Sequence, residues 1–249
     1  MDSELYSLSN EEIRVFLTRV RASADKHGVD IKQVHGLWPT VGDDKTAEDR
    51  QKTREYFVRQ IEYAHYLGAK YLVVHPVMPI RDGKDDSEET FLENERMLRS
   101  LIPHAEKWDV TVCIENMPFI NREISKVSVL KRLVRLINHP KIKICLDTGH
   151  ANIFHDDLGE DVRLLGDDLA VIHVHDNHGR NDAHLLPYFG TTEWESFLTA
   201  LGEVGFKGYF NLETRIPEKM PEPCREEMRL SLSRLASYMA DKASSNLKA

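Results

Sequence analysis

The chain has 249 residues, of which 41% are hydrophobic and 30% charged, a composition typical of globular proteins that argues against intrinsic disorder. No apolar run approaches the roughly 20 residues of a membrane-spanning helix, and residues 1–4 do not begin a signal peptide, so we expect a cytoplasmic protein. The net charge of −8, with Lys and Arg scattered among acids, disfavours a nucleic-acid partner.

Short apolar runs alternate with longer amphipathic ones, which predicts repeated strand–helix units and a parallel sheet. The predicted strands are Ile31–His35, Tyr71–His75, Val110–Asn116, Ile142–Asp147, Ala170–His175 and Tyr209–Glu213. Most of them are continuous apolar runs, as expected for parallel strands buried on both faces. No linker rich in Gly, Ser or Pro divides the chain, so we expect a single domain over residues 1–249.

Several helix boundaries are readable from local signals. Ser9–Glu12 and Thr192–Glu195 both fit a capping box, in which a side chain at each end satisfies backbone donors. Ser87 is a candidate cap for a helix that runs through Trp108, and Gly68 is a candidate C-cap of the preceding helix.

Two further groups of residues receive structural rather than functional interpretations. The densest basic group lies on one predicted helix and is interpreted as its solvated face; it consists of Lys126, Lys131, Arg132 and Arg135. The three cysteines show no C-x-x-C spacing, which predicts neither a disulfide framework nor a thiolate metal site; they are Cys113, Cys145 and Cys224. The first two lie in apolar runs, where a free thiol acts as a small hydrophobe.

Every predicted strand delivers a His, Asp or Glu at or near its end. These residues are His35, His75, Glu115, Asp147, His173 with His175, and Glu213. In a parallel barrel the carboxyl ends of the strands share one edge, where active sites lie. Gathered carboxylates repel one another unless a cation joins them, so we expect a divalent metal. Mixed imidazole and carboxylate ligands favour Zn, Mn or Co over Mg.

These motifs together resemble the xylose-isomerase-like barrel superfamily, from about residue 4 to residue 240. The matching motifs are His35, His75, Glu115-Asn116, Asp147-Thr148-Gly149-His150, His173 to Asp176, Asp182-Ala183-His184 and Leu212-Glu213-Thr214. The superfamily contains sugar and sugar-phosphate isomerases and epimerases, some dehydratases, and endonuclease IV. The resemblance implies an α/β fold, a parallel (β/α) TIM-type barrel.

The resemblance also implies two metal-ligand sets. In the epimerase branch one metal is held by four residues, which match Glu115, Asp147, His173 and Glu213. His175 competes with His173 for the His position, because the family pattern can be read in either register. We prefer His173, since Asp176 then supplies the family's His-x-x-Asp, although alternate residues of a strand face the same side and parity cannot separate the two. In the endonuclease IV branch three metals share nine ligands. Five of these nine ligands are absent from the epimerase set, and they match His35, His75, His150, Asp182 and His184.

Two functions follow as hypotheses. The first is an isomerase or epimerase of a keto sugar or sugar phosphate, in which the metal stabilises an enediolate and Glu115 and Glu213 transfer the proton. Whether these two glutamates also act as acid and base or serve only as ligands stays open. The residues expected to contact substrate are His150, His175, His184 and Trp38, although an exposed loop tryptophan is as often a lid residue.

The alternative is a trinuclear zinc phosphodiesterase that cleaves DNA at abasic sites. The nine matching ligands favour it. The acidic charge opposes it, as does the sequence Pro187–Gly190, an aromatic loop more typical of a small-molecule pocket. We therefore favour the isomerase over the nuclease, and a non-catalytic barrel less than either.

By the same resemblance, His35 ends the third strand of the barrel. We therefore expect six to seven strands, with the first βα unit or more lacking and Glu4–Leu8 as the candidate seventh strand. An uncovered parallel edge exposes unpaired backbone groups, so we expect a homodimer. Whether the substrate is phosphorylated stays open, because no Gly-rich loop leads into a helix N-terminus.

Overall fold

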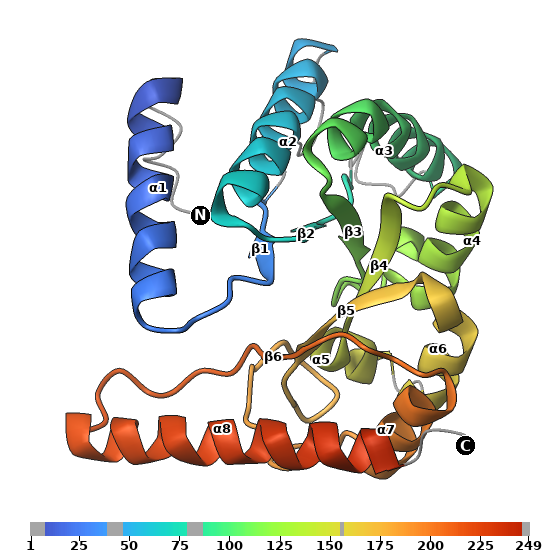
Figure 1. Ribbon diagram of the computed structural model, residues 1–249. Helices are drawn as coiled ribbons and strands as arrows, with labels where there is room; N and C mark the ends of the chain where they lie inside the picture. Colours follow the sequence, from blue (N-terminus) through green and yellow to red (C-terminus); the bar gives the residue numbers. More distant parts are fainter. Residues whose placement is uncertain (1–7, 39–46, 79–86, 155–156, 246–249) are drawn as a thin grey trace. The chain divides into compact units, whose positions relative to one another are not determined.

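In the computed structural model, residues 8–38, 47–78, 87–154 and 157–245 are described. Six parallel strands are found there, and their order in the sheet is their order in the chain (Figure 1). They are β1 Gln33–His35, β2 Tyr71–Val74, β3 Thr111–Glu115, β4 Ile142–Asp147, β5 Leu169–Val174 and β6 Phe210–Leu212. All six predicted strands are therefore confirmed, with ends that differ from the predicted ones by at most two residues.

Helices fill the connections between strands. They are α1 Asn10–Lys26, α2 Ala47–Leu67, α3 Ser87–Trp108, α4 Val127–Ile137, α5 Thr148–Ile153, α6 Leu158–Leu165, α7 Trp194–Glu203 and α8 Glu222–Ser245, with short 3-10 turns η2 Glu123–Ser125 and η3 Gly166–Asp168. This alternation of parallel strand and helix confirms the predicted α/β fold of the (β/α) barrel type. None of the described helices is both long and apolar enough to cross a membrane.

The chain divides into two compact units. The first unit contains the described residues up to Glu115, with residues 121–124 and 132–144, and the second contains the remainder. Within the first unit β1 pairs with β2 and β2 with β3; within the second β5 pairs with β6. The predicted single domain stays a prediction, as does the homodimer. The candidate seventh strand falls almost entirely outside the described residues.

The central strands β3 and β4 are buried because most of their side chains are apolar on both faces. In β3, Val112, Cys113 and Ile114 are all fully buried, and β4 repeats this pattern with Ile144, Cys145 and Leu146. Both cysteines are free thiols, as the sequence predicted. Alternate side chains of each strand therefore face opposite sides of a covered sheet, which leaves the polar strand ends as the place for chemistry.

Local signals set several helix ends as predicted. At the start of α1, Ser9 N donates to Glu12 Oε2 at 2.8 Å while Glu12 N donates to Ser9 Oγ, a complete capping box. After α2, Gly68 adopts φ +78° and its N–H and that of Ala69 bond back to the last turn of the helix. Such left-handed backbone suits Gly, which has no Cβ.

The second predicted capping box is wrong. Helix α7 begins at Trp194, and its N-cap residue Glu193 makes no side-chain cap hydrogen bond. Thr192 instead donates its hydroxyl to Asp176 at 2.8 Å. A buried carboxylate far away in the chain outcompetes the helix terminus for this side chain, which local sequence cannot reveal.

The interpretation of the basic residues on α4 as one solvated face is wrong for Lys131. Its side chain is buried, and Nζ donates to the carbonyl of Leu165 and to Asp168 Oδ2, both at 2.6 Å. Arg132 and Arg135 are exposed, as expected. Lys131 therefore joins α4 to the end of α6 through a paired charge.

Candidate metal centre

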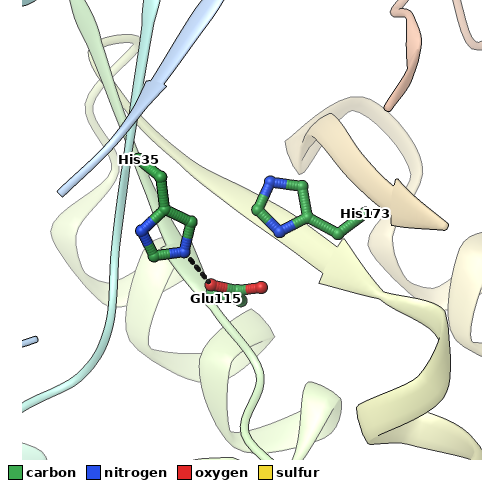
Figure 2. Close-up of side chains that lie close together, drawn as sticks. All are labelled: His35, Glu115 and His173. Atoms are coloured by element: carbon green, nitrogen blue, oxygen red, sulfur yellow. Dashed lines mark hydrogen bonds and ion pairs between the residues drawn. The ribbon is translucent and has the colours of Figure 1, made fainter. Parts of the chain in front are cut away.

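The ends of the first three strands bring two imidazoles to one carboxylate. His35 is the last residue of β1, His75 follows β2, and Glu115 ends β3. The Nε2 atoms of His35 and His75 lie 3.2 Å and 3.1 Å from the same oxygen, Oε2 of Glu115 (Figure 2 shows His35 with Glu115). Glu115 is buried, whereas the side chain of His35 is about one-third exposed, so the three side chains form a group of donor atoms that solvent reaches from the His35 side. Trp38 lies beside them, with its ring 4.5 Å from that of His75.

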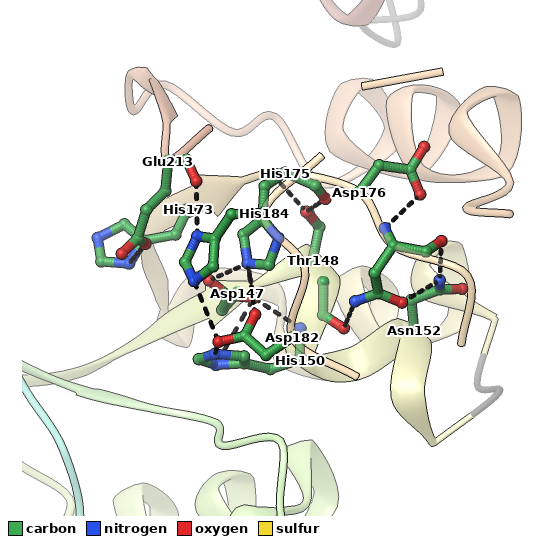
Figure 3. A network of polar contacts seen from close by, with 12 residues as sticks. Asp147, Thr148, His150, Asn152, His173, His175, Asp176, Asp182, His184 and Glu213 are labelled. Carbon is green, nitrogen blue, oxygen red and sulfur yellow. Dashed lines mark hydrogen bonds and ion pairs between the residues drawn. The ribbon is translucent and has the colours of Figure 1, made fainter. Parts of the chain in front are cut away.

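The second unit holds a larger cluster around Asp147, the last residue of β4 (Figure 3). The Nε2 atom of His175 lies 2.9 Å from Oδ1 and 3.0 Å from Oδ2 of Asp147. Asp147 also caps α5, where Oδ1 accepts the backbone N–H of His150 at 2.7 Å. The helix N-terminus thus presents Asp147 and His150 to the same point.

Asp182 and His184 join this cluster from the loop after β5. Asp182 Oδ2 lies 3.0 Å from Nε2 of His184 and 3.5 Å from Nε2 of His150. The His184 ring stacks on that of His175, with centroids 4.2 Å apart and planes within 15°. The other ring nitrogen of His184 hydrogen-bonds to the carbonyl oxygen of Glu213 at 2.7 Å, which orients the ring.

His173 and His175 contact different carboxylates, although both point to one side of β5. His173 Nδ1 lies 2.9 Å from Glu213 Oε2, whereas His175 is paired with Asp147. Nevertheless Asp147, His173 and Glu213 each offer a ligand atom within 4.8 Å of the others. The same holds for two trios that contain His175: Asp147, His150 and His175, and His175, Asp182 and His184. Both histidines therefore lie within metal-binding groups.

The pKa values of Asp182 and His184 are shifted by their contacts with neighbouring side chains. Burial opposes ionisation of Asp182, but hydrogen bonds from His150 and His184 outweigh it and hold the pKa of that carboxyl far below its ordinary value. The hydrogen bond to Asp182 raises the pKa of His184, despite the opposing effect of burial. An anionic carboxylate flanked by imidazoles supplies a set of metal ligands. Binding of a cation would displace the protons that the imidazoles carry.

The donor atoms of the cluster fit a divalent cation. Within the second unit, two buried atoms of this cluster lack any hydrogen bond among the described residues: Nδ1 of His175 and Oδ1 of Asp182. Buried polar atoms are nearly always satisfied, so such a concentration marks a place for an ion. Imidazole nitrogens mixed with carboxylate oxygens, without thiolates, suit Zn, Mn or Co.

The motifs matched from the sequence include the residues that position the cluster, but the sequence assigned no positioning role to them. Asn116 holds Asp147 through both backbone groups, accepting its N–H at 2.7 Å and donating to its carbonyl at 3.0 Å. Thr148 does the same for His175, accepting its N–H and donating to its carbonyl. Asn116 and Thr148 directly follow strand ends, and that position is the sequence signal that marks them.

Asp176 is also a positioning residue. Its two oxygens accept hydrogen bonds from the backbone N–H groups of Asn177, Gly190 and Thr192, from the Thr192 hydroxyl and from Trp194 Nε1. This carboxylate therefore closes the loop that carries Asp182 and His184. Within the same loop Tyr188 and Phe189 are exposed, so the predicted pocket wall remains a prediction.

A family model for the xylose isomerase-like TIM barrel matches residues 3–235. The chain belongs to the xylose isomerase-like TIM barrel family. This agrees with the resemblance inferred from the strand-end motifs. Among curated relatives, a probable endonuclease 4 of Mycoplasmopsis agalactiae is 28% identical over 167 residues, which are 64% of this chain and 54% of that protein. The matches to the first three such relatives cover between 53% and 58% of their lengths.

Solved structures share the fold of this family member. A D-tagatose 3-epimerase-like protein, 24% identical, superposes with a TM-score of 0.74 over 93% of this chain and 86% of its own. The IolI protein with a bound zinc atom, which is 18% identical, superposes with a TM-score of 0.77 over 94% of this chain and 83% of its own. The fold is therefore shared with a protein named for sugar epimerisation and with one that holds a zinc atom, and one curated relative is named as a probable endonuclease.

Proposed function

We propose that this protein is a divalent-metal-dependent isomerase or epimerase that acts on a keto sugar or its phosphate. The observation that carries the proposal is the convergence of ligand atoms from Asp147, His173 and Glu213, with Nδ1 of His173 only 2.9 Å from Oε2 of Glu213. Glu115 would supply the fourth ligand. Its neighbour Asn116 is bonded to both backbone groups of Asp147, which supports that assignment.

A metal held by these residues would polarise the substrate carbonyl and stabilise the enediolate that forms when the α proton leaves. In this proposal Glu115 and Glu213 remove and return that proton. Glu213 suits the role because its side chain is about one-third exposed and so accessible to substrate. His150, His175 and His184 would contact substrate hydroxyls, and Trp38, which is half-exposed beside His75, would pack on the sugar ring.

The test has two stages, beginning with metal content. Elemental analysis of protein purified without chelator or metal-binding tag should find about one Mn, Co or Zn per chain, since one four-ligand site needs one ion. The metal-loaded protein is then incubated with ketoses in D2O, and loss of the α-proton signal is followed by NMR. Proton exchange without metal, or no exchange on any ketose or ketose phosphate, would refute the proposal.

The variant Glu213→Gln should lower the exchange rate by about 10²- to 10⁴-fold, the usual contribution of a general acid–base group. Glu218→Gln is the matched control, because Glu218 is exposed in the loop that follows β6 and takes part in neither cluster. If Glu213→Gln exchanges protons normally while still binding metal, Glu213 acts as a ligand or spectator and not as the base.

The second candidate is a trinuclear zinc phosphodiesterase. The observation that favours it is the additional donor group of His175, Asp182 and His184, together with curated relatives named endonuclease 4. The net charge of −8 opposes it, because a protein that follows a phosphate backbone usually presents a basic face. About three zinc ions per chain, with cleavage of duplex DNA at an abasic site, would establish this function instead.

A further inference from the structure

A cavity of about 230 Å³ opens between α2 and α3, within the first unit. Its lining includes three arginines, Arg50 and Arg54 from α2 and Arg96 from α3, together with Glu93 of α3. None of these residues belongs to the two strand-end clusters. The cavity is therefore a separate feature that the proposed function does not use.

The positive charge of this arginine cavity is only partly compensated. Arg50 Nε lies 3.6 Å from Oε1 of Glu93, whose side chain is 9% exposed, and this pair cancels one charge. Arg54 and Arg96 make no ion pair or hydrogen bond with any other part of the chain that the structure describes. The Nε atom of Arg54 is buried and lacks a hydrogen-bond acceptor there. Arg54 Nε is therefore a buried donor available to a ligand, and Arg96 presents an exposed guanidinium group to the same cavity.

The neutral polar groups of the lining already donate within the chain, among them Gln51, whose Nε2 donates to Oε1 of Glu55 at 2.8 Å. The hydroxyl of Thr53 donates to the carbonyl of Asp49 at 3.1 Å, and that of Ser100 donates to the carbonyl of Met97 at 2.7 Å. Donors to a ligand must come from the guanidinium groups, whose planar N–H pairs match the oxygens of a phosphate. A buried charged donor without an acceptor is costly, and an anion removes that cost.

The cavity is also joined to the strand end that carries His75. Val77, two residues after His75, forms part of its wall. The side chain of Asn94 binds both backbone groups of Val77, accepting its N–H at 2.9 Å and donating to its carbonyl at 2.8 Å. Asn94 is fully buried and directly follows Glu93. The arginine cavity thus lies next to the rigidly held segment that follows His75 in the chain.

We propose that the arginine cavity binds a phosphoryl group through Arg54 and Arg96. The group is either the phosphate of a phosphorylated sugar substrate or that of a separate phosphate that binds independently. The binding itself does not rest on the proposed reaction. A volume of about 230 Å³ accommodates a phosphate with part of an attached carbon chain. The Arg50–Glu93 ion pair joins α2 to α3 at the wall of this cavity.

The test is a calorimetric titration of the whole chain with inorganic phosphate, in metal-loaded and in chelator-treated samples. Binding that persists after chelation cannot arise from phosphate captured by a metal. Arg54→Gln and Arg96→Gln should each weaken phosphate binding at least about tenfold, since a hydrogen bond to a charged group contributes about 1.5 to 3 kcal/mol. Arg54→Lys keeps the charge but loses the planar fork, so it should fall between Gln and the native residue.

Arg135→Gln is the matched control, because Arg135 is an exposed residue of α4 and its loss changes the net charge equally. Phosphate binding by this variant should stay within about twofold of the native protein, as expected for a distant, screened charge. The proposal is overturned if the native protein binds no phosphate at millimolar concentration. It is equally overturned if Arg54→Gln binds as the native protein does, or if the control loses binding to the same extent.

The source of the phosphoryl group is decided by competition. If it belongs to the substrate, a ketose phosphate displaces inorganic phosphate, a free ketose does not, and Arg54→Gln raises KM for the phosphorylated sugar alone. If it is a separate ligand, phosphate and ketose phosphate bind together. Failure of the isomerase proposal would appear as absent proton exchange and would leave the phosphate titration unchanged.

Discussion

Gly149→Ala tests whether the packing of His175 governs metal binding. A Cβ at position 149 would lie 2.0 Å from Cε1 and 2.3 Å from Nδ1 of His175. Ordinary carbon contacts are about 3.5 to 4.0 Å, so the ring would have to retreat by about 1.5 Å. The ring has little freedom to do so, because it is fully buried, paired with Asp147 and stacked on His184.

The shift breaks the 3.0 Å contact between His175 Nε2 and Asp147 and moves one donor of two metal-binding groups. Displaced or unsupported ligands typically lower metal affinity by about 10- to 100-fold, which is the expected effect. Overpacking costs about 1 to 3 kcal/mol. Because Gly149 lies in α5, where Ala has the higher helix propensity, the substitution also stabilises the fold by up to about 1 kcal/mol and offsets part of this cost. Metal titration by calorimetry and unfolding by denaturant measure the two effects separately.

Gly166→Ala is the control. Gly166 also lies in the second unit, has open space where a Cβ would be, and adopts φ +51°. The substitution should cost roughly 1 kcal/mol through backbone strain while leaving metal affinity unchanged. If Gly149→Ala folds and binds metal within about twofold of the native protein, the packing of His175 against the ligand Asp147 does not govern metal binding.

Three further predictions concern positioning and stability. Asp176→Asn replaces an oxygen that accepts hydrogen bonds, among them one from Trp194 Nε1, with an amide group that itself donates. We expect denaturant titration to show a free energy of unfolding about 2 to 4 kcal/mol lower. An unchanged free energy of unfolding would contradict the hydrogen-bond network around Asp176. Lys131→Met leaves Asp168 without its ammonium partner and should cost about 2 to 3 kcal/mol, part of which the added Asp168→Asn should restore; a cost equal to that of an exposed lysine would refute the buried pair. Hydrogen bonds from two lysines lower the pKa of Asp109 from 3.8 to about 2, so its stabilising effect is present above the ordinary value and lost as pH falls toward 2. The Tm difference between the native protein and Asp109→Asn should therefore vanish near pH 2, and a constant difference would contradict the assignment.

The positions of the strands and the residues at their ends were predictable from the sequence. Continuous apolar runs such as Ile142–Asp147 bury both faces of a strand, and the observed β4 has the same bounds. Because parallel strands place their carboxyl ends at one edge, the candidate ligands could be listed before any distance was known. Helix ends that depend on neighbouring residues, such as Ser9 with Glu12 and the left-handed Gly68, were predictable for the same local reason.

Only the tertiary structure decided which side chains meet. Thr192 serves Asp176 instead of its own helix, and Lys131 is buried against Asp168. His173 and His175, equivalent by strand parity, divide between Glu213 and Asp147. In each case the partner lies many residues away, and hydrogen-bond energy depends on distance and alignment in space, which the spacing of residues along the chain does not encode.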